Sequence, residues 1–228
     1  MNDPGPLVLS AANGPRAGSE REMSTDTSPA YTADEALARL MAGNERFVRG
    51  EARFPTVQKE ILAELARRQS PYVTLLGCSD SRVPPELVFD AGFGELFVVR
   101  VAGNVISPEV LGTLQYAGVH LHTPLFVVLG HEGCGAVDAA LSARRGAQEC
   151  ARIALLLETI VPGLRDLPSG LARDEEMRLA VEANVRWSMH QILETPEAKA
   201  RAAEGIMKLV GGVYELESGR VRLLPSRP

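Results

Sequence analysis

Hydrophobic positions recur at helical spacing in the segment that follows residue 30. The capping-box pattern T-x-x-E, formed by Thr32 and Glu35, predicts where this helix begins, and Gly50 predicts where it ends. Apolar residues three and four positions apart run through the segment, which indicates an amphipathic helix. A second helical stretch is expected from Ile61 to about Gln69. The two stretches together predict a helical N-terminal arm.

Beyond this arm, short apolar runs alternate with longer helical patterns. Strands are predicted at 72–76, 96–99, 125–129, 206–214 (broken by Gly211 and Gly212) and 221–224. Helices are predicted at 108–120, 135–145, 148–160 and 176–194, and a loop is expected around 163–176. The continuous apolar run at 125–129 is typical of a parallel strand buried on both faces. This alternation predicts an α/β fold with a central, mainly parallel sheet flanked by helices and joined by right-handed crossovers.

Length and composition are consistent with one domain. The chain has 228 residues, of which 45% are hydrophobic, so it can bury a sizeable core. Residues 1–30 are rich in Pro, Gly, Ser, Asn and charge and lack an apolar period, so we expect a disordered leader before a domain at 31–228. The start of the chain does not resemble a secretory signal, and no apolar run approaches the roughly 20 residues of a membrane span. We therefore expect a cytoplasmic protein without a membrane partner.

Charge and cysteine content narrow the chemistry further. A net charge of −5 does not indicate a protein that binds nucleic acid. The three cysteines are an odd number and too few for a disulfide framework in a chain of this size. Reduced thiols are therefore expected, available as metal ligands or nucleophiles.

The stretch GCSDSRV places a thiol, a carboxylate and a guanidinium at alternate positions, Cys78, Asp80 and Arg82. In an extended segment every second side chain points the same way, so the three would line one wall if the chain stayed extended after Gly77. Arg82 could then hold Asp80 in its ionised form by a charge-assisted hydrogen bond. The spacing predicts a chemical site rather than a chance cluster.

A second polar cluster, GHEGCG, follows the third predicted strand and contains His131 and Cys134. Three-residue spacing in a helical turn would put both side chains on one side, and a helix N-terminus favours a thiolate. Because both clusters follow strands, we expect them to meet at the carboxyl edge of the sheet. Two cysteines and one histidine form a Zn²⁺ ligand set that leaves a fourth position open.

Two roles are possible for Asp80 in such a centre. It could pair with Arg82 and accept a hydrogen bond from the zinc-bound hydroxide, which would orient the nucleophile. It could instead leave Arg82 and occupy the fourth metal position, which would shut the site. The residues alone leave both alternatives open.

With the motifs C-S-D-S-R, F-V-V-R-x-A-G-N (97–104) and G-H-x-x-C-G, the chain resembles the β-class carbonic anhydrases over about residues 32–224. The resemblance implies a sheet of strand order 2-1-3-4 with an extra edge strand, and a homodimer or homotetramer. It also implies one Zn²⁺ per chain and reversible hydration of CO₂ to bicarbonate by attack of zinc-bound hydroxide. Carried over by position, Cys78, His131 and Cys134 resemble the zinc ligands.

The same resemblance assigns roles to further residues. Asp80 and Arg82 match the family's catalytic dyad. Gln69 matches a glutamine that donates to the substrate, beside the backbone N–H of Gly135. The resemblance also implies that three residues line a substrate cleft at the subunit boundary: Phe97, Ala102 and Tyr116.

The chain departs from one subgroup of this family. That subgroup holds inhibitory bicarbonate with a tryptophan three positions before the first cysteine, where this chain has Leu75. Arg100 matches the subgroup's arginine, but its tryptophan partner is missing. We therefore expect no cooperative inhibition by bicarbonate.

Rival functions remain at this stage. A phosphatase with Cys78 as nucleophile would need an arginine six positions after the cysteine, whereas Arg82 follows Cys78 by four positions. It would also give no role to His131 and Cys134. A zinc hydrolase of a CO₂-like substrate such as carbon disulfide would use the same site. A non-catalytic zinc-binding regulatory module would need the ligands but not Asp80, Arg82 or Gln69. Thiol redox chemistry is disfavoured because the chain contains no C-x-x-C.

Overall fold

The computed structural model describes residues 31–53, 62–63 and 65–225. The predicted leader at 1–30 and Ile61, the start of the second predicted helix, lie outside the described residues. The first helix, α1 (Ala33–Val48), begins as the capping box predicts: the Glu35 N–H donates to Thr32 Oγ1 at 3.3 Å, and the Thr32 N–H donates to Glu35 Oε2 at 2.8 Å. Gly50 has a φ of +72°, which is the left-handed conformation of a residue that follows a helix end.

The sheet contains the predicted strands in the predicted order. Its strands are β1 (Val73–Gly77), β2 (Leu96–Arg100), β3 (Leu125–His131), β4 (Lys208–Tyr214) and β5 (Val221–Leu223), in the order β2-β1-β3-β4-β5. All neighbours are parallel except β4 and β5. Because β2 lies on one side of β1 and β3 on the other, the carboxyl ends of β1 and β3 flank a topological switch point. The fold class and the strand order are as predicted.

One prediction about the strands is wrong. Gly211 and Gly212 do not interrupt β4, because both pair with β3 in unbroken register. A Cβ on Gly211 would lie 2.6 Å from the sulfur of Met189 in the long helix α7 (Arg173–Leu193), so the missing side chain serves close packing rather than a chain break.

The remaining elements connect and cover the strands. They are α3 (Pro85–Val88), η1 (Ala102–Asn104), α4 (Pro108–His120), α5 (Gly135–Arg144), α6 (Ala151–Ile160), η2 (Val161–Leu164), α7 (Arg173–Leu193) and α8 (Pro196–Ala203). The loop expected around 163–176 is shorter than predicted, because η2 extends to Leu164 and α7 begins at Arg173.

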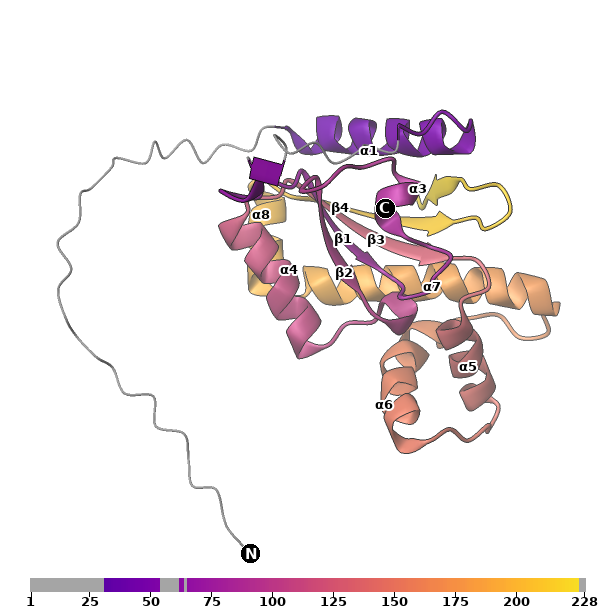
Figure 1. Cartoon of the computed structure of the whole chain (residues 1–228). Helices are drawn as coiled ribbons and strands as arrows, with labels where there is room; N and C mark the ends of the chain where they lie inside the picture. Colours follow the sequence, from indigo (N-terminus) through magenta and orange to yellow (C-terminus); the bar gives the residue numbers. More distant parts are fainter. Residues whose placement is uncertain (1–30, 54–61, 64, 226–228) are drawn as a thin grey trace, which may run out of the picture.

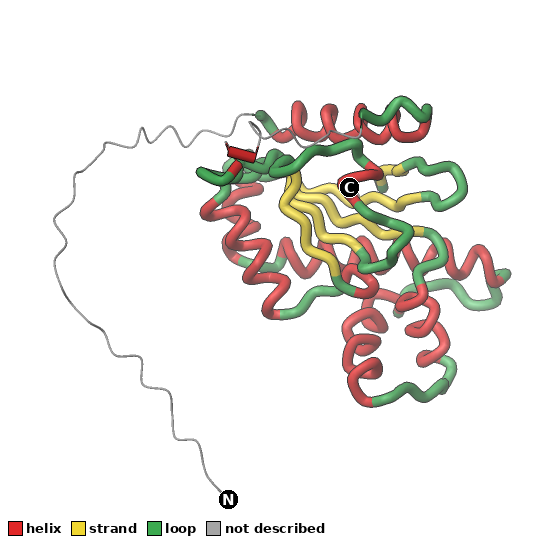
Figure 2. The backbone as a smooth tube through the Cα atoms, viewed as in Figure 1, coloured by secondary structure: helices red, strands yellow, loops and turns green. Residues whose placement is uncertain are grey.

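Helices cover both faces of the sheet (Figures 1 and 2). Alternate residues of each strand feed two separate cores, as strand geometry requires. In β1, Leu75 packs in the core beneath α1 and α3, and Leu76 packs in the larger core against α4, α5, α6 and α7. The helices α5 and α6 form an antiparallel pair that extends beyond the sheet (Figure 1). Among the described residues, no helix combines the length and the apolar character that crossing a bilayer would take.

Candidate metal centre

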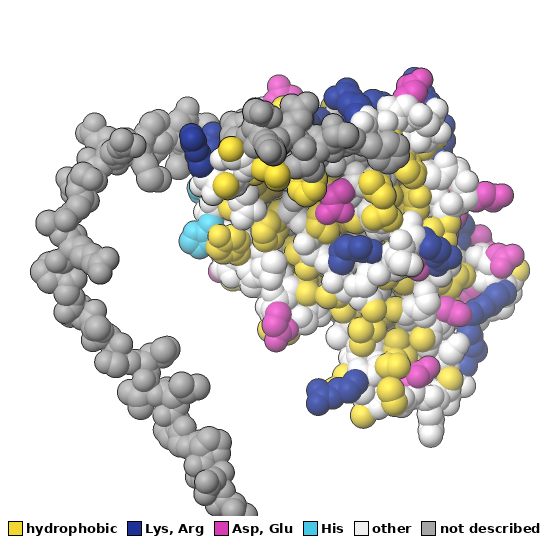
Figure 3. All heavy atoms as spheres, in the orientation of Figure 1, with side chains coloured by type: hydrophobic (Ala, Val, Ile, Leu, Met, Phe, Trp, Pro, Cys, Tyr) yellow, Lys and Arg dark blue, Asp and Glu magenta, His cyan; other side chains and the backbone are white. Residues whose placement is uncertain are grey.

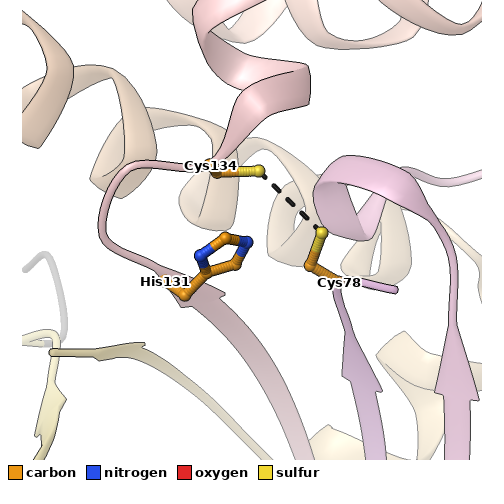
Figure 4. A group of neighbouring side chains, drawn as sticks. All are labelled: Cys78, His131 and Cys134. Atoms are coloured by element: carbon orange, nitrogen blue, oxygen red, sulfur yellow. Dashed lines mark hydrogen bonds between the residues drawn. The ribbon is translucent and has the colours of Figure 1, made fainter. Parts of the chain in front are cut away.

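Cys78, His131 and Cys134 meet at the carboxyl edge of the sheet. Their ligand atoms all lie within 4.8 Å of one another, and all three residues are buried (Figure 4). The two sulfurs are 3.9 Å apart, far beyond the roughly 2.05 Å of a disulfide bond. Two sulfurs bound at about 2.3 Å to one tetrahedral zinc would be separated by roughly 3.8 Å. The spacing therefore fits two thiolates that share a metal ion.

Three different elements position these ligands. Cys78 is the first residue after β1, His131 is the last residue of β3, and Cys134 is the N-cap of α5. Between the last two, Gly133 reverses the chain with a φ of +59°. His131 and Cys134 are thus brought together by a strand end and a tight turn, and not by the helical turn predicted from their spacing.

A hydrogen bond on one side of the His131 imidazole leaves its other nitrogen available as a metal ligand. Its Nδ1 lies 2.9 Å from the carbonyl oxygen of Glu132, which can only accept, so Nδ1 carries the proton. In the neutral ring Nε2 then has a free lone pair, and this atom is buried without a hydrogen-bond partner among the residues that the structure describes. An unpaired buried acceptor is costly, and a metal ion is the partner that would satisfy it.

The two thiols behave as a pair. The pKa of Cys78 is lowered to about 4, chiefly because the Cys134 thiol donates to it, with further donation from the Gly103 N–H. The same contact strongly raises the pKa of Cys134, because a second thiolate would be buried beside the first. Backbone N–H groups at the start of α5 oppose this rise, as expected for a helix N-terminus. A divalent cation between the sulfurs would remove the repulsion.

Asp80 is held by Arg82 in a bidentate ion pair. Nε of Arg82 donates to Oδ1 at 2.9 Å and Nη2 donates to Oδ2 at 2.7 Å, while the Arg82 backbone N–H also donates to Oδ1. These bonds hold the pKa of Asp80 well below its usual range. Asp80 Oδ2 lies 3.7 Å from His131 Nε2, so the carboxylate is beside the centre without belonging to the group of three ligands.

The geometry of this pair differs from the extended wall predicted from the alternate spacing. The chain turns after Asp80, where the Val83 N–H donates to the Asp80 carbonyl oxygen at 3.0 Å. In a straight strand the two side chains would leave the backbone about 6.5–7 Å apart. The turn folds Arg82 back onto Asp80 and makes the bidentate contact possible.

Arg100, at the end of β2, fixes the same loop from the other side. Its Nε donates to the Cys78 carbonyl oxygen at 2.9 Å and its Nη2 donates to the Asp80 carbonyl oxygen at 2.6 Å. The sequence alone did not predict that Arg100 would fix this loop. The available signal was the pairing of Arg100 with Gly77, which follows once β2 is placed beside β1.

The other predicted site residues divide into two groups. Ala102 and Gly135 are exposed and adjoin the centre, since each is the neighbour of a residue that contacts or supplies a ligand. Phe97 and Tyr116 stack on each other with ring centroids 6.2 Å apart, but Phe97 pairs with Thr74, near the opposite end of β1. Gln69 is exposed and precedes β1, so the length of this strand separates it from Cys78. One chain alone does not bring the second group to the ligands.

The fold and the centre together define a class: an α/β protein with a mainly parallel sheet and a Cys₂His group suited to a metal ion at the switch point of that sheet. A family model described as carbonic anhydrase matches residues 73–221. The chain is 40% identical over 190 residues to carbonic anhydrase 2 of Mycobacterium tuberculosis, covering 81% of this chain and 89% of that protein. It is 41% identical over 186 residues to a carbonic anhydrase of Mycolicibacterium smegmatis, with the same coverage.

Structural similarity agrees with these sequence matches. A β-carbonic anhydrase of Coccomyxa, solved in complex with acetazolamide, superposes with a TM-score of 0.65 at 28% identity, covering 82% of this chain and 86% of that chain. The chain belongs to the carbonic anhydrase family and, within it, to the β class.

Proposed function

We propose that the chain is a zinc-dependent carbonic anhydrase that interconverts CO₂ and bicarbonate. The observation that carries this proposal is the buried group of two sulfurs and one unpaired imidazole nitrogen, with an ionised carboxylate 3.7 Å from that nitrogen. Membership of the β class supports the same reaction. Each chain is proposed to hold one zinc ion.

The donor set fits zinc by its chemistry. Cys78, His131 and Cys134 would hold the ion, and two thiolates would balance its double charge. A zinc ion held by these three residues would acidify a bound water and so would supply the nucleophile at near-neutral pH. The Nδ1 bond to the Glu132 carbonyl oxygen keeps the His131 ring in the tautomer that presents Nε2.

Asp80 and Arg82 form the proposed catalytic dyad. Because Arg82 occupies both carboxylate oxygens, Asp80 stays ionised and can accept a proton or a hydrogen bond beside the centre. Arg100 restrains the backbone of the same loop, so the carboxylate keeps its place during turnover. The Gly135 N–H, in the first turn of α5, is proposed to stabilise charge that develops on the substrate.

The cleft residues require a second copy of the chain under this proposal. Gln69, Phe97 and Tyr116 lie toward the end of the sheet opposite the ligands, so they would serve the centre of a neighbouring subunit, while Ala102 would line the chain's own centre. In the described part of the chain β2 is an edge strand of the sheet, and this position together with the exposed ring of Tyr116 supports an interface there. Hydrophobic side chains are also visible across the face shown in Figure 3. We propose a homodimer or homotetramer located in the cytoplasm.

The rival functions fit the geometry less well. A phosphatase would leave the His131 and Cys134 contacts unused. A purely structural zinc module would have no use for an ion pair that keeps a carboxylate beside the metal. A hydrolase of carbon disulfide would share the centre, and only its substrate would distinguish it.

Stopped-flow measurement of CO₂ hydration tests the proposal. The zinc-loaded chain is expected to accelerate hydration far above the buffer rate, and removal of zinc by a chelator is expected to abolish the effect until zinc returns. A parallel assay with carbon disulfide separates the two substrates. Zinc-loaded protein that accelerates neither reaction would support the non-catalytic module instead.

A further inference from the structure

Two buried polar side chains of α7 contact the turn at Gly103 and Asn104, which lies beside the metal centre. Nδ2 of Asn184 donates to the carbonyl oxygen of Gly103 at 2.8 Å, and Oγ of Ser188 donates to the carbonyl oxygen of Asn104 at 2.9 Å. Both side chains are about 1% exposed. Neither takes part in the mechanism described above, and they lie more than 80 positions from their partners in the sequence.

The turn that they hold is conformationally demanding. Gly103 and Asn104 both adopt the left-handed region, with φ values of +68° and +44°. For Asn104 this conformation costs free energy and needs support from its surroundings. At Gly103 a side chain would also collide with Ile160, since a Cβ there would lie 2.9 Å from its Cδ1. The two α7 hydrogen bonds supply tertiary support for this turn.

This turn directs a backbone N–H group at the sulfur of Cys78. The Gly103 N–H donates to Cys78 Sγ at 3.3 Å. A hydrogen bond to a thiolate withdraws charge from the sulfur and restricts its direction, and such outer contacts tune a metal site. The chain of contacts therefore runs from α7 through the turn to a ligand atom.

Glycines allow α7 to come close enough for these contacts. A Cβ on Gly130, the residue before His131, would lie 2.6 Å from Cγ2 of Val185. Gly211 on β4 avoids a similar collision with Val185 and Met189. Val185 is the neighbour of Asn184, so the approach of the helix to the sheet brings Asn184 and Ser188 within reach of the turn.

We propose that Asn184 and Ser188 are positioning residues of the metal centre, which fix the left-handed turn so that the Gly103 N–H stays directed at the Cys78 sulfur. This inference rests on the proposed role of Cys78 as a zinc ligand. Loss of either bond should loosen the turn, weaken the N–H···S contact and leave a more electron-rich, less constrained sulfur.

The test compares Asn184→Ala and Ser188→Ala with a matched control, Asn44→Ala, in the full chain. Asn44 is a buried asparagine with three hydrogen bonds of its own, to Val88, Gly219 and Val221, in the other core. Zinc affinity is measured by competition with a chelator, the sulfur-to-metal charge-transfer band is recorded with Co²⁺ as the probe, and thermal unfolding is followed for every variant.

The two α7 variants are expected to bind zinc roughly 10- to 100-fold more weakly and to move the cobalt band to lower energy. The control is expected to lose thermal stability while its zinc affinity and cobalt band match the wild type. Wild-type affinity and band in Ser188→Ala, the milder variant, would overturn the inference even if Asn184→Ala failed to fold. An equal loss in Asn44→Ala would also overturn it.

The outcomes separate this inference from the proposed function. If the wild-type chain itself shows no sulfur-to-cobalt band, the assignment of cysteine ligands fails. If the wild type shows the band and the α7 variants leave it unchanged, only the positioning role fails.

Discussion

At the scale of single residues, the contact between Asp80 and Arg82 determines what the centre can do. Two side-chain hydrogen bonds and one backbone hydrogen bond converge on one carboxylate, which is therefore ionised throughout the range in which proteins are usually assayed. An ionised carboxylate beside a cation site can accept a proton or orient a nucleophile. It can also turn toward the metal if Arg82 releases it.

Substitution of the dyad tests this role. Asp80→Asn removes the acceptor and Arg82→Ala removes the group that orients it, so each is expected to lower the hydration rate at alkaline pH by about 100-fold. Zinc content should be unchanged, since neither residue is among the three ligands. The comparison variant is Arg145→Ala, which loses an exposed ion pair with Glu176 and should keep full activity. Undiminished rates in both dyad variants would remove the dyad from the mechanism.

Most of the ligand set could be predicted from residue order alone. Cys78 comes directly after one apolar strand pattern, His131 follows another, and Cys134 lies three residues beyond His131, while parallel strands bring their carboxyl ends to one edge. The geometry of the bidentate contact of Arg82 with Asp80 could not be predicted, because it depends on a turn after Asp80 and not on the alternation of side chains along a strand. The contact of Asn184 with Gly103 left no local signal, since it spans 81 positions.

At the scale of secondary-structure elements, the approach of α7 to the sheet positions the site. The sequence predicted α7, β3 and β4 with bounds close to those observed. It misassigned Gly211 and Gly212, because a glycine pair in a strand pattern signals a chain break as readily as it signals close packing. Only the position of the neighbouring helix distinguishes the two cases.

The packing role of Gly211 is testable by substitution. In Gly211→Ala the new methyl group would meet Met189 and Val185 at 2.6 and 2.8 Å, so we expect a loss of about 1–3 kcal/mol in the free energy of unfolding, measured with urea. Gly112→Ala is the control, because Gly112 lies within α4 and no atom of the described residues would lie within 4 Å of an added Cβ. The control should be neutral or more stable by about 0.5–1 kcal/mol. Equal stability of the two variants would contradict the packing argument.

At the scale of the whole molecule, β2 is an edge strand of the sheet formed by the described residues. The residues of this strand are only partly buried, and the nearby ring of Tyr116 is 47% exposed. Phe97 and Tyr116, which the family resemblance assigns to the substrate cleft, lie near this edge and toward the end of the sheet opposite the chain's own ligands. A completed active site therefore requires an assembly under the proposed function.

The chain lacks one of the residues that the family resemblance links to inhibition by bicarbonate. Leu75 is fully buried where a regulatory tryptophan would stand, and Arg100 is already committed to the carbonyl oxygens of Cys78 and Asp80. We therefore expect non-cooperative dependence of the hydration rate on bicarbonate at mildly acid pH, measured by stopped flow over a bicarbonate series. A steep cooperative loss of activity there would contradict this expectation.

The central claim is that Cys78, His131 and Cys134 together bind one zinc ion. Zinc-edge X-ray absorption on the full-length wild-type chain, with metal content determined on the same sample, tests it most directly. The account predicts one zinc per chain with two sulfur neighbours at about 2.3 Å and nitrogen or oxygen neighbours at about 2.0–2.1 Å. A zinc ion surrounded only by nitrogen and oxygen, or a folded chain that retains no zinc, would contradict it.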